Sequence, residues 1–259
     1  MKEKDDSSNI ALIVSNSKLT NSIHLLNSSP QTTASSYTNN NNNNSSPTSS
    51  VSILPEGWTQ NTLYKTTDSQ NKSTYTFRSM KSPYETIYTS SKTGMFNYII
   101  NDSKQQKVAT ISSSLLSNNF TVCDIDKNPL MKVKYSLNMF GLFGQIKFEV
   151  NIMKYIDVNK DIGNIPCDFI NKEPEYSPIY KSYYLKFIGR IIKSSVKNFQ
   201  LIDKGSPKKS TDNIYYQFAL LQSDEVFVCD FKEPFTNLLG FALGVIALSS
   251  KMFCEQINE

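Results

Sequence analysis

The sequence predicts a mainly β protein, a closed antiparallel β-barrel around an apolar C-terminal helix. Three observations support this fold class. Short segments with alternating apolar and polar residues recur from residue 74 onward, turn-forming residues separate them, and an uncharged apolar segment occupies 238–248. Many short strands without helical periodicity between them are typical of a sandwich or a barrel. A closed barrel has no edge strand to protect and can enclose another element.

Residues 1–52 are expected to form a disordered Asn/Ser/Thr-rich tail, followed by one domain over 53–259. The tract TNNNNNNSSPTSS at 38–50 and its surroundings are polar, and such a composition buries too little apolar surface to offset the entropy of ordering. Two apolar islands, Ile10–Val14 and Ile23–Leu26, interrupt the tail. We interpret them as incidental hydrophobic residues, with a short helix that docks on a partner as the alternative.

Strand patterns then follow one another along the domain. Ile146–Ile152 and Tyr183–Phe187 alternate with period two, and turn chemistry bounds each segment. Similar short segments are TYTFRS (74–79), ETIYTS (85–90), FNYIIN (96–101), NNFTVCDI (118–125), MKVKYSLN (131–138), SVKNFQLI (195–202), NIYYQFAL (213–220) and EVFVCDF (225–231).

The segment LLGFALGVIAL at 238–248 admits three interpretations: a membrane anchor, a buried strand or a buried helix. An anchor needs about 20 apolar residues, and charged residues lie on both sides of this shorter segment. A strand would be richer in β-branched residues than this Leu-, Ala- and Gly-rich sequence. A helix that is apolar on every side is buried on every side. We therefore expect a helix inside the barrel.

Composition argues against several functions. The net charge of +4 makes no strong case for nucleic acid, which attracts a concentrated basic face, but allows modest attraction to an anionic membrane. The four cysteines form no C-x-x-C pair, so a zinc site is not expected. The sequence has no G-x-x-x-x-G-K-[ST] loop or dinucleotide-binding fingerprint, so no cofactor is expected. His24, the only histidine, lies in the tail, which leaves no Ser-His or Cys-His pair. The start MKEKDDSSN is not a secretory signal. We expect a non-enzymatic intracellular protein.

Two motifs resemble the tubby family. FIGRIIKSSVKNFQ (187–200) is similar to the signature F-x-G-R-V-x-x-A-S-V-K-N-F-Q, and FALGVIALSSKMFCE (241–255) is similar to the C-terminal signature F-A-I-A-L-S-S-F-D-x-K-L-A-C-E. Weaker similarities occur at 118–124, 135–150 and 230–241. The resemblance implies a tubby-like domain of about twelve strands around a hydrophobic C-terminal helix. The matching positions are expected to be structural; they are Gly189, Arg190, Lys197, Asn198, Phe199, Gln200, Phe241, Cys254 and Glu255.

The resemblance also implies phosphoinositide binding, chiefly of phosphatidylinositol 4,5-bisphosphate, in a basic pocket on the barrel wall. Lys and Arg suit this ligand because they donate charge-assisted hydrogen bonds to phosphate. Of the family's basic segment only Lys92 remains, in TSSKTGMFNYII (89–100), and Ser112 stands where the family has an Arg. Basic residues on nearby segments are candidates to compensate: Arg78, Lys81, Lys104 and Lys107.

The resemblance thus implies a monomeric adaptor that docks on the inner leaflet of the plasma membrane and links protein cargo to trafficking machinery, with the cilium or nucleus as further compartments. Two alternatives stay open. One is a protein-interaction or transcription-regulating module that has lost lipid binding. The other is a scramblase-like lipid-handling protein, although scramblases carry Cys- and Pro-rich segments that this sequence lacks.

Overall fold

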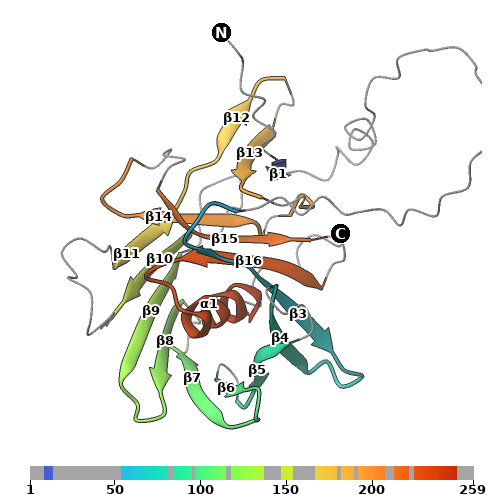
Figure 1. Cartoon of the computed structure of the whole chain (residues 1–259), viewed down its shortest axis with the longest axis vertical. Coiled ribbons are helices and arrows are strands. Elements are labelled where there is room, and N and C mark those ends of the chain that lie inside the picture. The colour runs from blue at the N-terminus through green and yellow to red at the C-terminus, as the bar shows by residue number, and fades with distance from the viewer. Residues whose placement is uncertain are drawn as a thin grey trace, which may run out of the picture.

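The computed structural model describes residues 9–13, 54–80, 85–94, 97–114, 118–136, 147–153, 167–179, 182–189, 192–195, 197–207, 213–221 and 225–249. Within these residues the chain forms strands and one helix (Figure 1). The strands are β1 (Asn9–Ile13), β2 (Trp58–Thr59), β3 (Asn61–Thr67), β4 (Ser73–Ser79), β5 (Thr86–Lys92), β6 (Tyr98–Asp102), β7 (Lys107–Ser113), β8 (Asn119–Asp124), β9 (Pro129–Ser136), β10 (Lys147–Ile152), β11 (Asp168–Asn171), β12 (Glu175–Ser177), β13 (Ser182–Phe187), β14 (Phe199–Asp203), β15 (Ile214–Leu220) and β16 (Val226–Lys232), and the helix is α1 (Asn237–Ser249).

The strands β3 to β11 and β14 to β16 form a closed antiparallel barrel in the described part of the chain. Neighbours follow the order β15-β14-β11-β10-β9-β8-β7-β6-β5-β4-β3-β16, and pairing between β15 and β16 closes the ring of twelve strands. Of the thirteen strands that this sheet has in the described residues, only β2 lies outside the ring, paired with β16. The predicted fold class, a mainly β protein with a closed antiparallel barrel, is confirmed.

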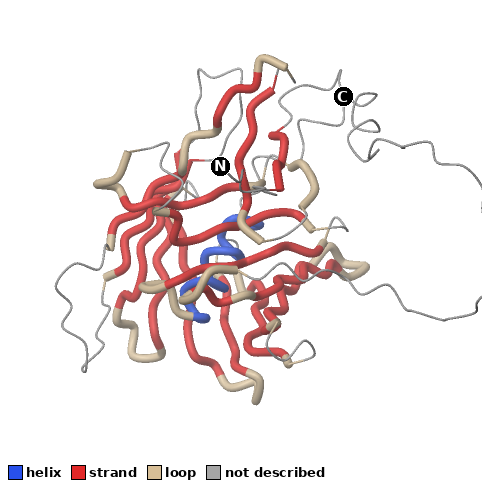
Figure 2. The backbone as a smooth tube through the Cα atoms, turned by 45° about the horizontal axis from the view of Figure 1, so that its top comes forward, coloured by secondary structure: helices blue, strands red, loops and turns tan. Residues whose placement is uncertain are grey.

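Helix α1 lies inside the barrel, as the apolar segment predicted (Figures 1 and 2). Every residue from Leu239 to Leu248 is buried. Phe241 packs against Phe77 and Tyr88 on the inner wall. The helix begins after Thr236, whose hydroxyl accepts a hydrogen bond from the Leu239 amide at 3.3 Å, as N-cap residues do. Among the described residues, no helix has the length and apolarity that a membrane span requires.

A second, three-stranded sheet with the order β1-β13-β12 lies outside the ring (Figure 1). β13 carries the same alternation as the barrel strands, yet it pairs with β12 and β1 and packs against the outer wall. Leu185 and Phe187 of β13 form a small apolar cluster with Ala219 of β15. Because β13 covers the outer wall here, β14 and β15 are buried on both faces.

The N-terminal segment Asn9–Ile13, expected within a disordered tail, forms strand β1. It pairs antiparallel with β13 over five residues, from Asn9 opposite Phe187 to Ile13 opposite Tyr183. The remaining residues of the predicted tail that precede Leu54 lie outside the described residues, and so do Lys81, Arg190, Cys254 and Glu255.

Candidate functional site: a basic surface on the barrel wall

Lys92 and Ser112 lie on opposite faces of the sheet. Lys92 ends β5, opposite Tyr98 of β6, which in turn lies opposite Ile111 of β7. Directly opposed residues point to the same face, and Tyr98 and Ile111 are buried inside the barrel. Lys92 therefore belongs to the inner row at one end of the barrel. Ser112, one residue beyond Ile111, is exposed on the outer wall.

The other candidate basic residues do not join Lys92. Arg78 pairs with Thr86 at the far end of β5 from Lys92, about 20 Å away for six residues of strand. Its guanidinium lies over the ring of Tyr64 at 4.7 Å. Lys104 and Lys107 are exposed around the turn between β6 and β7. The structure therefore does not bring the described candidates together into one cluster.

A different set of lysines converges on the outer wall. A shallow cavity of about 120 Å³ opens over β9, β10 and β11, and its polar lining comprises Lys132, Lys134, Glu149, Asn151, Asp168 and Lys204. We call these six residues the basic wall. Its lysines were missed in the sequence analysis, although a signal for two of them was present. The alternation in MKVKY buries Met131 and Val133 and turns Lys132 and Lys134 outward.

Strand pairing sets the spacing of the basic wall. Lys134 lies opposite Glu149, and Lys132 lies opposite Asn151. Lys204 follows β14, and its amide donates to the carbonyl of Asp168 at 2.9 Å. Because β11 pairs with β14, Lys204 lies near lysines that are about 70 residues earlier in the sequence. No local pattern could have indicated this third lysine.

The charges around the cavity favour an anion. The side-chain amide of Asn151 donates a hydrogen bond to the Asp168 carboxylate at 2.6 Å. One of the two acidic residues that line the cavity, Glu149 and Asp168, is therefore already hydrogen-bonded. Within the described part of the chain, none of the three lysine ammonium groups forms an ion pair. Three ammonium groups against the Glu149 and Asp168 carboxylates leave a positive balance at the cavity.

Ser112 lies in the same row as the basic wall. It is opposite Thr121 of β8, and Thr121 is opposite Lys132 of β9. Two strand spacings of about 4.8 Å separate Ser112 from Lys132. The position at which the family carries an Arg therefore lies beside the lysines that the structure brings together.

Two signature amides, Asn198 and Gln200, and the amide of Gln217 hold β13 and the residues after it against the barrel. Gln200 of β14 donates to the carbonyl of Lys186 at 2.8 Å. Gln217 of β15 donates to the carbonyl of Ile188 at 2.8 Å and accepts from its amide at 3.2 Å. Asn198 donates to the carbonyl of Lys193 at 2.7 Å. Buried polar groups need such partners, and these give the three amides a structural role.

The remaining described signature residues contribute conformation or packing. Gly189 has a φ of +79°, in the left-handed region that favours glycine. The ring of Phe199 packs against Phe148 and Phe218, with centroids 4.9 and 5.4 Å apart. The amide of Lys197 donates to the hydroxyl of Ser195 at 3.2 Å.

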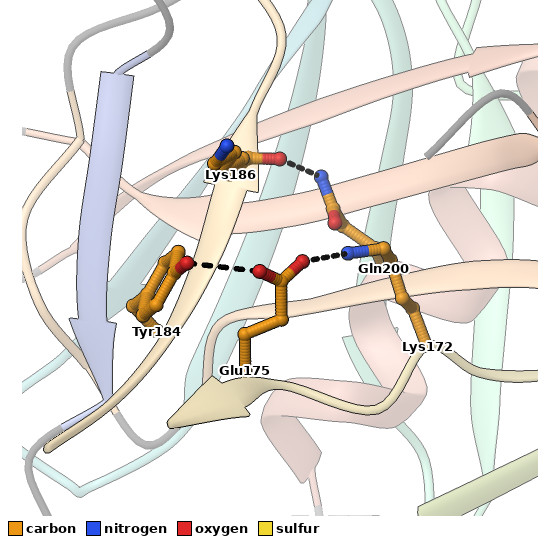
Figure 3. A network of polar contacts seen from close by, with 5 residues as sticks. All are labelled: Lys172, Glu175, Tyr184, Lys186 and Gln200. Atoms are coloured by element: carbon orange, nitrogen blue, oxygen red, sulfur yellow. Dashed lines mark hydrogen bonds and ion pairs between the residues drawn. The ribbon is translucent and has the colours of Figure 1, made fainter. Parts of the chain in front are cut away.

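A buried lysine lies beneath the outer sheet (Figure 3). The side chain of Lys172 is 1% exposed, and its ammonium lies 3.8 Å from the Glu175 carboxylate, which also accepts from the Tyr184 hydroxyl at 2.8 Å. Burial lowers the pKa of Lys172; Glu175 opposes this effect and Lys186 adds to it. Because the ammonium is enclosed and Glu175 is its close partner, we assign this network to the attachment of β12 and β13.

The described residues contain no cluster of three or more metal-ligating side chains. The basic wall forms a shallow cavity with a net positive charge on the outer face of the barrel. Such a surface can hold a phosphate-bearing anion through charge-assisted hydrogen bonds.

Comparisons with known proteins agree with the motifs. A model of the Tub family matches residues 3–251. Tubby-related protein 3 of Mus musculus is 29% identical over 183 residues, covering 57% of this chain and 38% of that protein. Tubby protein homolog 1 of Caenorhabditis elegans is 28% identical over 184 residues, covering 57% and 42%. Protein king tubby 2 of Aedes aegypti is 35% identical over 97 residues, covering 38% and 22%. The matched part thus spans less than half the length of each of these relatives.

Proposed function

The chain belongs to the Tub family, and we propose that it is a non-enzymatic adaptor whose barrel docks on phosphoinositide at the inner surface of the plasma membrane. Phosphatidylinositol 4,5-bisphosphate is the proposed ligand. Protein cargo bound elsewhere on the chain would be brought to that membrane, and delivery to the cilium is one route for such cargo.

The observation that carries this proposal is the set of three lysines around the cavity of the basic wall. A bisphosphate headgroup concentrates negative charge, and each hydrogen bond from an ammonium to phosphate contributes about 1.5–3 kcal/mol. Two or three such contacts give a measurable preference over a lipid with a single negative charge. Glu149 at the rim opposes the anion, so its neutralisation is expected to strengthen binding.

Vesicle sedimentation with single variants tests the proposal. Lys132→Ala and Lys134→Ala each remove one contact and weaken binding to vesicles containing phosphatidylinositol 4,5-bisphosphate by about tenfold or more. Lys72→Ala is the matched control, because it removes the same charge from the exposed turn between β3 and β4. Equal loss in all three variants would reveal nonspecific attraction and contradict the assignment to the basic wall.

Two variants that are expected to bind the vesicles more tightly complete the test. Glu149→Gln removes the opposing carboxylate, and Ser112→Arg adds a cation in the row of Lys132. Both are expected to tighten binding. Lys92→Ala separates the two candidate surfaces, because Lys92 belongs to the inner row while the basic wall faces outward. A large loss in Lys92→Ala, with none in Lys132→Ala, would move the contact to the end of the barrel.

A further inference from the structure

The outer sheet contains a strand contributed from far away in the sequence. β1 pairs with β13 through a five-residue antiparallel ladder, and residues 14–57 separate it from β2, the next strand in the described part of the chain. The main-chain ladder to β13 is the one strand pairing that β1 makes in the described structure. Figure 3 shows β1 as the strand beside β13, on the side away from β12.

The β13 edge is held extended by the barrel, independently of β1. Gln200 and Gln217 bind the backbone at Lys186 and Ile188, and the buried Leu185 and Phe187 anchor the strand on β15. Removal of β1 would therefore leave β13 in place, with a row of backbone donors and acceptors exposed. A preorganised, unpaired edge is a template for another strand.

From this arrangement we propose that the β13 edge is a strand-addition site for an extended, uncharged apolar segment of a partner protein. In this chain Asn9–Ile13, with the sequence NIALI, occupies the edge, and the partner's segment replaces it in the same antiparallel register. Main-chain hydrogen bonds supply the affinity in this mode of recognition, and side chains supply the selectivity. The N-terminal segment is then an intramolecular competitor for the site.

The chemistry of the partner segment can be inferred from the segment that now pairs with the β13 edge. NIALI contains no charge and has Ile at two positions and Leu at a third, which are residues suited to a strand. A partner segment with these properties satisfies the same ladder. A proline-containing segment does not, because proline lacks the amide donor.

Hydrogen exchange on the full-length chain tests the proposal. The double variant Ala11→Pro/Ile13→Pro disengages β1, and amides of β13 that face it should exchange roughly tenfold faster or more, because they lose their acceptors. Amides of the barrel strand β8 should be unchanged and serve as the folding control. A synthetic peptide of residues 7–15 should then restore protection in β13, and the same peptide with proline at position 11 should not.

Three results would overturn the proposal. Unchanged exchange of β13 in the double-proline variant would mean that β1 does not occupy the edge. Failure of the unmodified peptide to restore protection would mean that the edge accepts no segment in trans. Protection that appears in the wild type only above a dimerisation threshold would make a second copy of this chain the occupant.

Discussion

Burial of a charge inside the barrel is the most direct perturbation of the fold. Val245 is fully buried in α1, and Val245→Asp removes the burial of a valine side chain, worth about 1.5–3 kcal/mol. An enclosed carboxylate without a partner adds several kcal/mol. The sum approaches the whole stability of an ordinary domain, about 5–15 kcal/mol. We expect Val245→Asp, and equally Leu243→Asp, to be insoluble or unfolded.

Thr236→Asp is the matched control for this prediction. It introduces the same charge next to the same helix, but Thr236 is exposed at the N-cap, where a carboxylate can cap the helix and interact favourably with its dipole. Thermal unfolding followed by circular dichroism should show a cooperative transition for Thr236→Asp close to that of the wild type. A soluble Val245→Asp protein that melts cooperatively would refute the enclosed position of α1.

Three further predictions concern buried groups. Burial lowers the pKa of Lys172, so the folded chain disfavours its charged form, a penalty that is present at neutral pH and falls as pH rises toward the ordinary lysine value. In urea unfolding, the stability of the wild type relative to Lys172→Met should therefore rise between pH 7 and pH 10; an unchanged difference over that range would show that folding does not lower the pKa of Lys172. Gln217→Leu leaves both backbone groups of Ile188 without their partner and should speed amide exchange at Ile188, whereas Gln106→Leu at an exposed turn should not. An added Cβ at Gly240 would overlap the ring of Phe231, so Gly240→Ala should lower stability by about 1–3 kcal/mol, and Phe231→Leu should recover part of the loss in the double variant; an unchanged melting temperature for Gly240→Ala would contradict this packing.

Local patterns were enough to predict the barrel and its helix. Alternation identified β4 and β8 because buried apolar side chains occupy inner positions there, Tyr75 and Phe77 in β4 and Phe120 and Val122 in β8. It missed β7, where the sequence KVATISS carries Ser and Thr on the outer face and a small Ala on the inner one. It also missed β11, which is only four residues long. In both cases the pairing of neighbouring strands determines the structure, and no short segment contains that information.

The site and the outer sheet depend on contacts between distant residues. The two lysines of β9 could have been predicted from their alternation, but Lys204 reaches them only through the pairing of β11 with β14. The alternation in β13 predicts a barrel strand. The strand instead lies outside the ring, where side-chain amides of β14 and β15 bind its backbone and the residue that follows it. The NIALI segment is too short for its partner to be inferred from composition.

The central claim is a preference of this chain for phosphoinositide over other anionic lipids. It is tested most directly by sedimentation of the wild-type chain with two vesicle populations of equal surface charge, one containing phosphatidylinositol 4,5-bisphosphate and the other phosphatidylserine, at physiological salt. The lysines of the basic wall predict binding to the first population that is tighter by about tenfold or more, since clustered phosphates engage several ammonium groups at once. Equal binding to both populations would contradict headgroup recognition.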